Sequence, residues 1–220
     1  FIDKNFHNPI INKVAFSLGV SFIHSSSMEK LMKENILECR NTFKDKEFEV
    51  VFHHGLDKDK FLSTHGSTST HNQRHNEFAK WLEEQNINYV DISGSAENLI
   101  NYYQTVDLHI GYRVHAHIFM NSISKFSILI SEDGRAKGAK EVIGGIVLDG
   151  FISYKNDFLS KVFNRLVKNY DKFKANEYLT QEITSNIEYE KNINYIRIKN
   201  SRKQIDNNFE VMKQFLKQLP

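Results

Sequence analysis

Residues 111–115, with the sequence GYRVH, bring a permanent cation and an imidazole close together. They follow a short apolar run and should open a helix. There the charge of Arg113 opposes the helix dipole by about 0.3–1 kcal/mol unless an anion lies nearby. A guanidinium group can bind a carboxylate or phosphate through two parallel hydrogen bonds. The pattern therefore predicts an anion site at Arg113, and the alternative is an arginine that turns away to a surface carboxylate.

Three histidines lie in or beside this segment, and they are not equivalent. His115 and His117 flank Ala116 and point about 200° apart on a helix, so only one of them can face a given ligand. His115 shares the entry turn with Arg113 and is the candidate catalytic residue, because histidines titrate near neutral pH and can transfer protons. We expect His117, which precedes an apolar run, and His109, inside a short strand, to be structural.

A second charged segment covers residues 131–137, with the sequence SEDGRAK. It mixes two carboxylates with two cations around a glycine and follows a strongly apolar run. Asp133, Arg135 and Lys137 are candidate substrate-binding residues, because cations placed beside a reacting group can stabilise the charge on a leaving phosphate. A solvated turn is the alternative interpretation.

These segments need a scaffold, and the rest of the sequence predicts one. Short β-branched and aromatic runs alternate with stretches of helical periodicity, which is typical of an α/β fold with a Rossmann-like parallel sheet and flanking helices. The expected strands are residues 13–17, 48–53, 88–92, 107–111, 126–130 and 145–148. The expected helices are residues 28–42, 72–85, 96–105, 113–122 and a short one near 137–143.

Beyond residue 149 the pattern becomes purely helical. Apolar residues recur at helical spacing between 158 and 170, and again in the tail at Ile205, Phe209, Met212 and Leu216. We interpret both stripes as core-facing sides of helices. The chain is then a single domain, with residues 1–150 forming the Rossmann-like part and residues 151–220 forming C-terminal helices that pack on it.

Ligands of an open parallel sheet bind at the carboxyl ends of its strands, next to helix N-termini. This rule adds Ser95 to the candidate substrate-binding residues, because it lies in the turn between the third strand and the next helix. The strand ends expected at this edge are residues 24–27, 53–60, 93–95, 111–115 and 131–137.

The composition limits the possible functions. The 220 residues carry 29 Lys and Arg against 27 Asp and Glu, so the net charge of +2 predicts no general attraction to nucleic acid. The one cysteine, Cys39, excludes an internal disulfide and favours a reducing compartment, so we expect the cytoplasm. No apolar run reaches the roughly 18 residues of a membrane span. The start at Phe1 instead of Met suggests a missing upstream portion.

The two charged segments together resemble part of the polysaccharide pyruvyl transferases. That family has an aspartate and an apolar strand that lead into an Arg-Leu-His-Ala helix start, then a strand and a loop with Tyr-Asp-x-Lys. The similar stretches here are 107–111, Arg113-Val114-His115-Ala116 and Glu132-Asp133-Gly134-Arg135. With the preceding helix, the resemblance covers about fifty residues. Val114 stands in place of Leu, Glu132 in place of an aromatic residue, and Arg135 in place of Lys.

The resemblance implies the C-terminal half of a two-domain fold similar to GT-B glycosyltransferases, with the N-terminal half absent. It implies pyruvyl transfer from phosphoenolpyruvate to a sugar or lipid-linked glycan, forming a ketal in bacterial-type polysaccharide biosynthesis, with no cofactor. Arg113 would bind the donor and His115 would supply a proton. Arg135 or Lys137 would stabilise the leaving phosphate, and Asp133 would orient one of them or bind a sugar hydroxyl.

Other functions remain open. The same cations could hold the diphosphate of a nucleotide-sugar in a glycosyltransferase, or the chain could be a non-catalytic module that binds an anion or a partner. His71 and His75 could share one helix face, but they lack the adjoining Glu of a zinc hydrolase motif, so we assign no metal. The first strand leads into Leu18-Gly19-Val20 without further glycines, so a dinucleotide cofactor is not expected.

Overall fold

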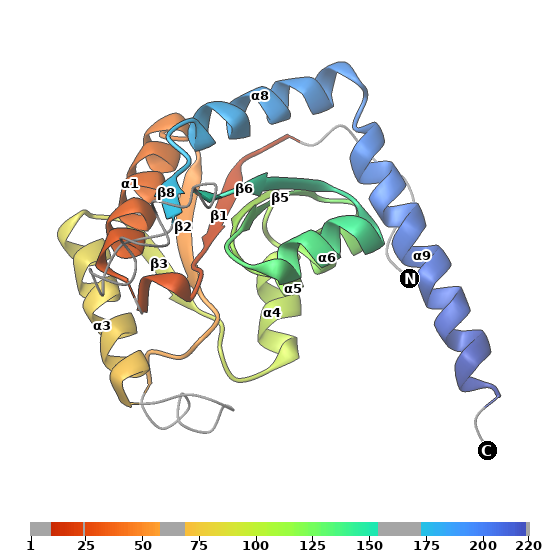
Figure 1. Cartoon of the computed structure of the whole chain (residues 1–220), viewed down its shortest axis with the longest axis horizontal. Helices are drawn as coiled ribbons and strands as arrows, with labels where there is room; N and C mark the ends of the chain where they lie inside the picture. The colour runs from red at the N-terminus through yellow and green to blue at the C-terminus, as the bar shows by residue number, and fades with distance from the viewer. Residues whose placement is uncertain (1–9, 24, 58–68, 154–172, 219–220) are drawn as a thin grey trace, which may run out of the picture.

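A computed structural model of the chain describes residues 10–23, 25–57, 69–153 and 173–218. At its centre is a six-stranded parallel sheet in the order β3-β2-β1-β4-β5-β6, which is the Rossmann order (Figure 1). The predicted fold class is therefore confirmed. The strands are β1 (Lys13–Ser17), β2 (Glu47–Phe52), β3 (Asn88–Asp91), β4 (Leu108–Gly111), β5 (Phe126–Ser131) and β6 (Ile146–Asp149).

Helices cover both faces of the sheet. On one face Phe16 and its neighbours pack against α1 (Ser26–Thr42), α3 (Ser69–Glu84) and α8 (Leu179–Asn192). On the other face Ala15, Val51 and Leu129 lie under α4 (Ala96–Tyr103), α5 (Val114–Ser122) and α6 (Gly134–Ile143). Adjacent residues such as Ala15 and Phe16 serve opposite faces because side chains alternate along a strand.

The predicted elements agree with the structure to within a few residues at their ends. The short helix η1 (Ser21–Ile23) leads from β1 toward α1, whose N-cap is Ser25. The main shift concerns α6, which begins at Gly134 and not near residue 137. Asp133 explains the earlier start, because its side chain accepts a hydrogen bond from the Arg135 backbone N–H and caps the helix.

The prediction of purely helical structure after residue 149 is wrong. The strands β7 (Phe151–Ser153) and β8 (Phe173–Ala175) pair antiparallel in a separate two-stranded sheet. Gly150 ends the preceding segment, and aromatic and β-branched residues such as Phe151 and Ile152 favour extended backbone. The apolar stripe predicted between residues 158 and 170 lies outside the described residues.

The prediction for the C-terminal tail is also wrong. The helix α9 (Ile196–Leu216) buries Ile198 and Ser201 near its start, where it packs on α5 and α6. It then continues away from the sheet (Figure 1), and Phe209, Met212 and Leu216 are 46–53% exposed. An amphipathic pattern requires a partner surface to bury it, and the body of the domain ends before this half of α9 is reached. No helix within the described ranges is both long and apolar enough to cross a membrane.

Candidate functional site

Arg113 lies at the point where the strand order of the sheet reverses. β1 pairs in parallel with β2 on one side and with β4 on the other, and Arg113 joins the end of β4 to the start of α5. Ligands of open α/β sheets bind in the crevice at this point. The chain therefore places its most unusual cation where this architecture binds ligands.

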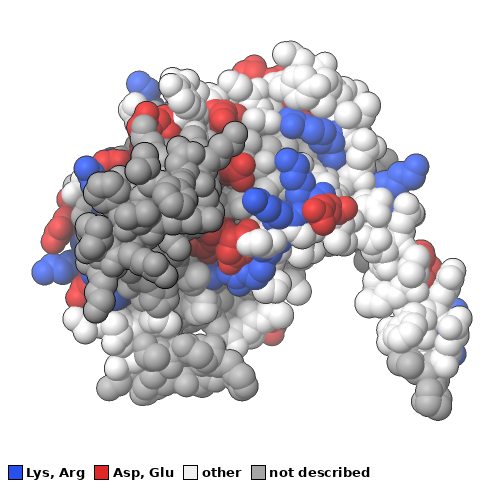
Figure 2. All heavy atoms as spheres, viewed as in Figure 1, with Lys and Arg blue, Asp and Glu red and all other residues white. Residues whose placement is uncertain are grey.

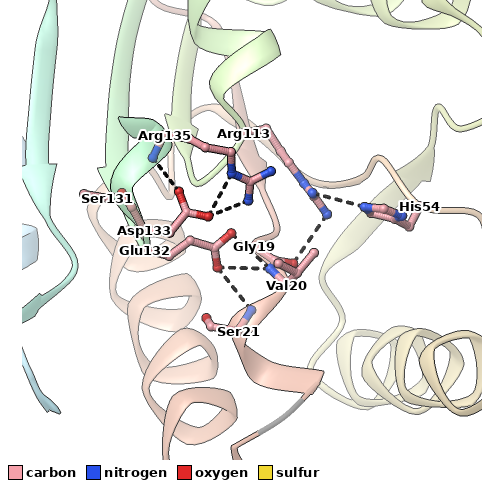
Figure 3. Close-up of polar contacts among 9 residues, drawn as sticks. All are labelled: Gly19, Val20, Ser21, His54, Arg113, Ser131, Glu132, Asp133 and Arg135. Carbon is pink, nitrogen blue, oxygen red and sulfur yellow. Dashed lines mark hydrogen bonds and ion pairs between the residues drawn. The ribbon is translucent and has the colours of Figure 1, made fainter. Parts of the chain in front are cut away.

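The Arg113 guanidinium points along the sheet edge toward the loops after β1 and β2 (Figure 3). Its Nη1 donates to Nε2 of His54 at 3.2 Å, and its Nη2 lies 3.5 Å from the carbonyl oxygen of Gly19. Its Nε is buried without a hydrogen-bond partner, and Arg113 forms no ion pair in the part of the chain that the structure describes. Arg113 does not turn away to a surface carboxylate, so its charge remains available to an anion at the predicted site.

Burial shapes the electrostatics around this cation. It lowers the pKa of Arg113 to about 10, so the side chain stays charged at neutral pH. Burial and the Arg113 charge lower the pKa of His54 to about 4, so its ring is neutral and can accept the hydrogen bond from Arg113. A partly desolvated cation whose hydrogen bonds go only to neutral groups favours an anionic ligand.

An open pocket of about 540 Å³ lies between α4, α5 and the ends of β2 and β3, and Arg113 is not among the residues that line it. His115, Ser95 and His53 line it together, so the structure brings two of the predicted site residues into one place. The Ser95 hydroxyl also accepts a hydrogen bond from the Asn98 backbone N–H at 3.1 Å and caps α4. The remaining wall is mostly apolar and includes Ile92, Leu99, Ile100, Ile118 and Phe119.

His109 and His117 are both fully buried, as is expected of structural histidines. Each makes a hydrogen bond to the Ser127 hydroxyl, at 2.7 Å from His109 and 2.8 Å from His117. His115, in contrast, is exposed on the first turn of α5. His115 is therefore accessible to a ligand, whereas His109 and His117 are not.

The predicted Asp133 to Lys137 turn has a different character. The Asp133 carboxylate accepts hydrogen bonds from the backbone N–H and the Nε of Arg135, both at 2.8 Å, and pairs with Nη2 of Arg135 at 2.6 Å. These two charges therefore satisfy each other at the start of α6, while Lys137 is exposed on the same helix. Figure 2 shows such basic and acidic side chains lying beside one another near the middle of this face.

Glu132 is a site residue that sequence reasoning did not select. Its carboxylate accepts hydrogen bonds from the backbone N–H groups of Val20 at 3.0 Å and Ser21 at 3.1 Å (Figure 3). Gly19 makes room for it, because a Cβ there would lie 2.3 Å from Oε2 of Glu132. An internal anion thus occupies the loop after β1, and its charge favours the charged form of the neighbouring Arg113. The signal in the sequence was a carboxylate directly after a buried strand.

His53 and His54 were also missed as individual residues, although the strand end that contains them was expected at this edge. Two adjacent histidines directly after a strand were the available signal. His71 and His75 lie in α3, where His75 Nδ1 is 2.7 Å from the carbonyl oxygen of His71. Within the described ranges no three His, Cys, Asp or Glu side chains are grouped so that they could hold a metal ion.

Comparison with known proteins shows no family. No family model and no curated protein sequence matches the chain. Among solved structures it is similar to the UDP-GlcNAc 2-epimerase of Methanocaldococcus jannaschii, determined in complex with UDP-GlcNAc and UDP, with 14% sequence identity and a TM-score of 0.45. The similar region covers 82% of this chain and 46% of that one, so this chain spans about half of that protein. A likeness of this degree concerns the path of the backbone and says nothing about activity.

Proposed function

We propose that this chain is the donor-binding half of a sugar-modifying transferase that resembles the polysaccharide pyruvyl transferases. The observation that supports this most is the state of Arg113. It lies at the crevice of a Rossmann-like sheet, makes no ion pair with a described carboxylate and has a buried Nε without a partner. Phosphoenolpyruvate offers both a carboxylate and a phosphate to such a group.

The reaction assigned to the site makes a ketal and releases phosphate. Two sugar hydroxyl oxygens form bonds to C2 of phosphoenolpyruvate, and the bond from C2 to the phosphate oxygen breaks. Of the two hydroxyl protons, one is balanced by protonation of C3, which becomes a methyl group, and the other leaves with phosphate. Arg113 holds the donor anion, and His115, on the same turn, supplies the proton to C3. The sugar lies in the pocket against Ser95 and the apolar wall.

The turn after β5 has a smaller role in this proposal than in the sequence-based prediction. Asp133 and Arg135 neutralise each other, so neither is free to bind a substrate without breaking that pair. Lys137 remains an exposed cation on α6 that can approach a departing phosphate from solvent. The principal donor contact is therefore assigned to Arg113.

A nucleotide-sugar donor is the second candidate, and the pocket favours it. A volume of about 540 Å³ with apolar walls is typical of a site for a nucleoside or a sugar ring and exceeds the needs of a three-carbon donor. The first candidate fills this space with the acceptor sugar, whereas the second fills it with the nucleoside. In both cases Arg113 binds phosphate oxygens.

Ligand-induced thermal stabilisation distinguishes the candidates. Phosphoenolpyruvate at 100 times its Kd should stabilise the fold by about 2.7 kcal/mol, which raises the Tm by several degrees. Arg113→Met should reduce this stabilisation to about 0.3–1.4 kcal/mol, because it weakens donor binding by about 10–150-fold, and the matched control Arg135→Met should retain it. A shift with uridine diphosphate but not with phosphoenolpyruvate would establish the second candidate. A shift with inorganic phosphate equal to that of either donor would leave only an anion-binding module.

A further inference from the structure

The loop that follows β1 holds an anion that belongs to the protein itself. The Glu132 carboxylate, from the turn after β5, accepts hydrogen bonds from the backbone N–H of Val20, at 3.0 and 3.2 Å, and from that of Ser21, at 3.1 Å (Figure 3). Consecutive backbone N–H groups that converge on one anion form a concave site of the kind that also binds phosphate. We call Gly19, Val20 and Ser21 the β1 loop.

The β1 loop fits closely around this carboxylate. A Cβ atom at position 19 would lie 2.3 Å from Oε2 of Glu132 and 2.9 Å from its Cδ, so a residue other than glycine would push the carboxylate out. Glu132 forms no ion pair with another residue in the described ranges, so its hydrogen bonds to the loop are what hold it. The Ser21 hydroxyl is buried and has no hydrogen-bond partner among the described residues. The β1 loop therefore has one more donor than Glu132 uses.

Arg113 contacts the same loop at the other end of one peptide group. Its Nη2 lies 3.5 Å from the carbonyl oxygen of Gly19, and that carbonyl shares its peptide group with the Val20 N–H that binds Glu132 (Figure 3). The C=O and N–H of a trans peptide point in opposite directions, so the guanidinium and the carboxylate lie on the two sides of the loop. A ligand held by Arg113 therefore has the β1 loop and Glu132 as neighbours.

The position of Glu132 is one where this architecture commonly binds a ligand. In dinucleotide-binding proteins with this strand order, the turn after the first strand holds phosphate. A ligand that placed one phosphate on Arg113 and a second on the β1 loop would have to expel Glu132 and break its hydrogen bonds. If Glu132 stayed, the second phosphate would lie beside a carboxylate, and like charges repel. A ligand with one phosphate meets neither cost.

We propose that Glu132 is a specificity-determining residue, which fills the phosphate site of the β1 loop and restricts the crevice to donors with a single phosphate group. The inference deepens the function proposed above, on which the identity of the donor rests. It favours phosphoenolpyruvate, whose one phosphate Arg113 can hold, over a nucleotide-sugar with two. The exclusion of a second phosphate does not depend on which donor is used.

Titration calorimetry with inorganic phosphate and inorganic pyrophosphate tests this exclusion. The wild type should bind pyrophosphate less than about tenfold more tightly than phosphate, because only one phosphate group finds donors. In Glu132→Ala the N–H groups of Val20 and Ser21 are free to bind the second phosphate. The ratio of the two affinities should then rise by at least about tenfold, the contribution of one hydrogen bond to a charged group.

A control must separate this effect from the loss of one negative charge. Glu141→Ala removes the same charge from an exposed position on α6, outside the β1 loop, and should leave the ratio unchanged. Thermal unfolding shows whether each variant is folded. A residue that only tied the β1 loop to the turn after β5 would lower the Tm when removed, without changing the ratio.

Glu132→Gln keeps the test decisive if Glu132→Ala does not fold. The glutamine amide oxygen can still accept from the β1 loop, so the fold is kept while the repelling charge is lost. Its ratio of affinities should rise above that of the matched control Glu141→Gln, although by less than in Glu132→Ala.

Three results would overturn the proposal. The first is a wild type that already binds pyrophosphate about tenfold or more tightly than phosphate. The second is an unchanged ratio in the folded Glu132 variants, and the third is binding of neither probe by the wild type and these variants. Neither probe is the proposed donor. If phosphoenolpyruvate fails to stabilise the wild type, the proposed function fails, while the ratio still decides the role of Glu132.

Discussion

Two neighbouring groups of polar residues flank Arg113, and they differ in how far their charges are satisfied. On the β5–α6 side, Glu132, Asp133 and Arg135 are rich in charge, but each is bound to protein groups. On the other side, toward the ends of β2 and β3, lie His53 and His115. Neither has a permanent charge, and both line the pocket. A charged segment in a sequence therefore does not by itself locate a binding site. A ligand can bind only to donors and acceptors that the fold has left without partners.

The residues that line the pocket should contribute most to catalysis. The variant His115→Gln tests this, and it has the largest expected effect. Loss of a general acid should lower the rate of transfer by about 10²–10⁴-fold without unfolding the domain, because His115 is exposed. The measurement is phosphate release from phosphoenolpyruvate with a panel of hexose acceptors. A folded variant with full activity would remove His115 from the mechanism.

Arg113 and Arg135 should differ in how much they contribute to donor affinity. Arg113→Met should weaken donor binding by about 10–150-fold, since a hydrogen bond to a charged group contributes about 1.5–3 kcal/mol. Arg135→Met removes a cation of the same kind that is paired with Asp133, so it should change affinity by less than about threefold. Isothermal titration of both variants gives the comparison, and equal losses would contradict it.

Two histidines buried inside the fold, His109 and His117, should make its stability sensitive to acid. The folded-state pKa values of His109 and His117 are lowered, so between pH 6.5 and about 4 the unfolded chain binds protons that the folded chain cannot. The stability is fully present above pH 6.5 and falls as the pH drops, by about 1.4 kcal/mol per pH unit for each histidine.

Urea unfolding at pH 7.5, 6.5 and 5.5 measures this slope. In the variant His117→Gln, which removes one of these two groups, the slope should be smaller by about 1.4 kcal/mol per pH unit. A free energy of unfolding that does not vary over this range would show that the two buried histidines are not held neutral.

The smallest expected effect lies on the β5–α6 side. Asp133→Ala removes the N-cap of α6 and should destabilise the fold by about 1 kcal/mol, while Asp133→Asn retains an acceptor and should lose less. Neither should affect donor binding much. Thermal unfolding with and without the donor separates the two effects, and a large loss of affinity in Asp133→Asn would return this residue to the binding site.

Local features of the fold were predictable from the sequence, and long-range features were not. The six strands follow from short apolar runs whose pattern does not depend on distant residues. Arg113 could be placed because helix starts and strand ends are also local. The contact of Glu132 with Val20 joins residues 112 positions apart, and no local pattern encodes it. The apolar stripe of α9 has the same periodicity whether or not a surface covers it, so Phe209 was assigned wrongly to the core.

Gly111 and Ser17 face each other across β4 and β1, and this pair limits how the sequence can vary. Gly111 has a φ of +141°, and a Cβ there would lie 2.4 Å from the Ser17 carbonyl oxygen and 2.5 Å from its Oγ. Any side chain at 111 would therefore displace the serine that hydrogen-bonds to the His109 ring and to the Arg113 backbone N–H. Homologues that retain the site proposed here should keep both residues together, whereas those that replace either one should have lost the hydrogen bonds by which Ser17 ties β1 to His109 and to the Arg113 backbone.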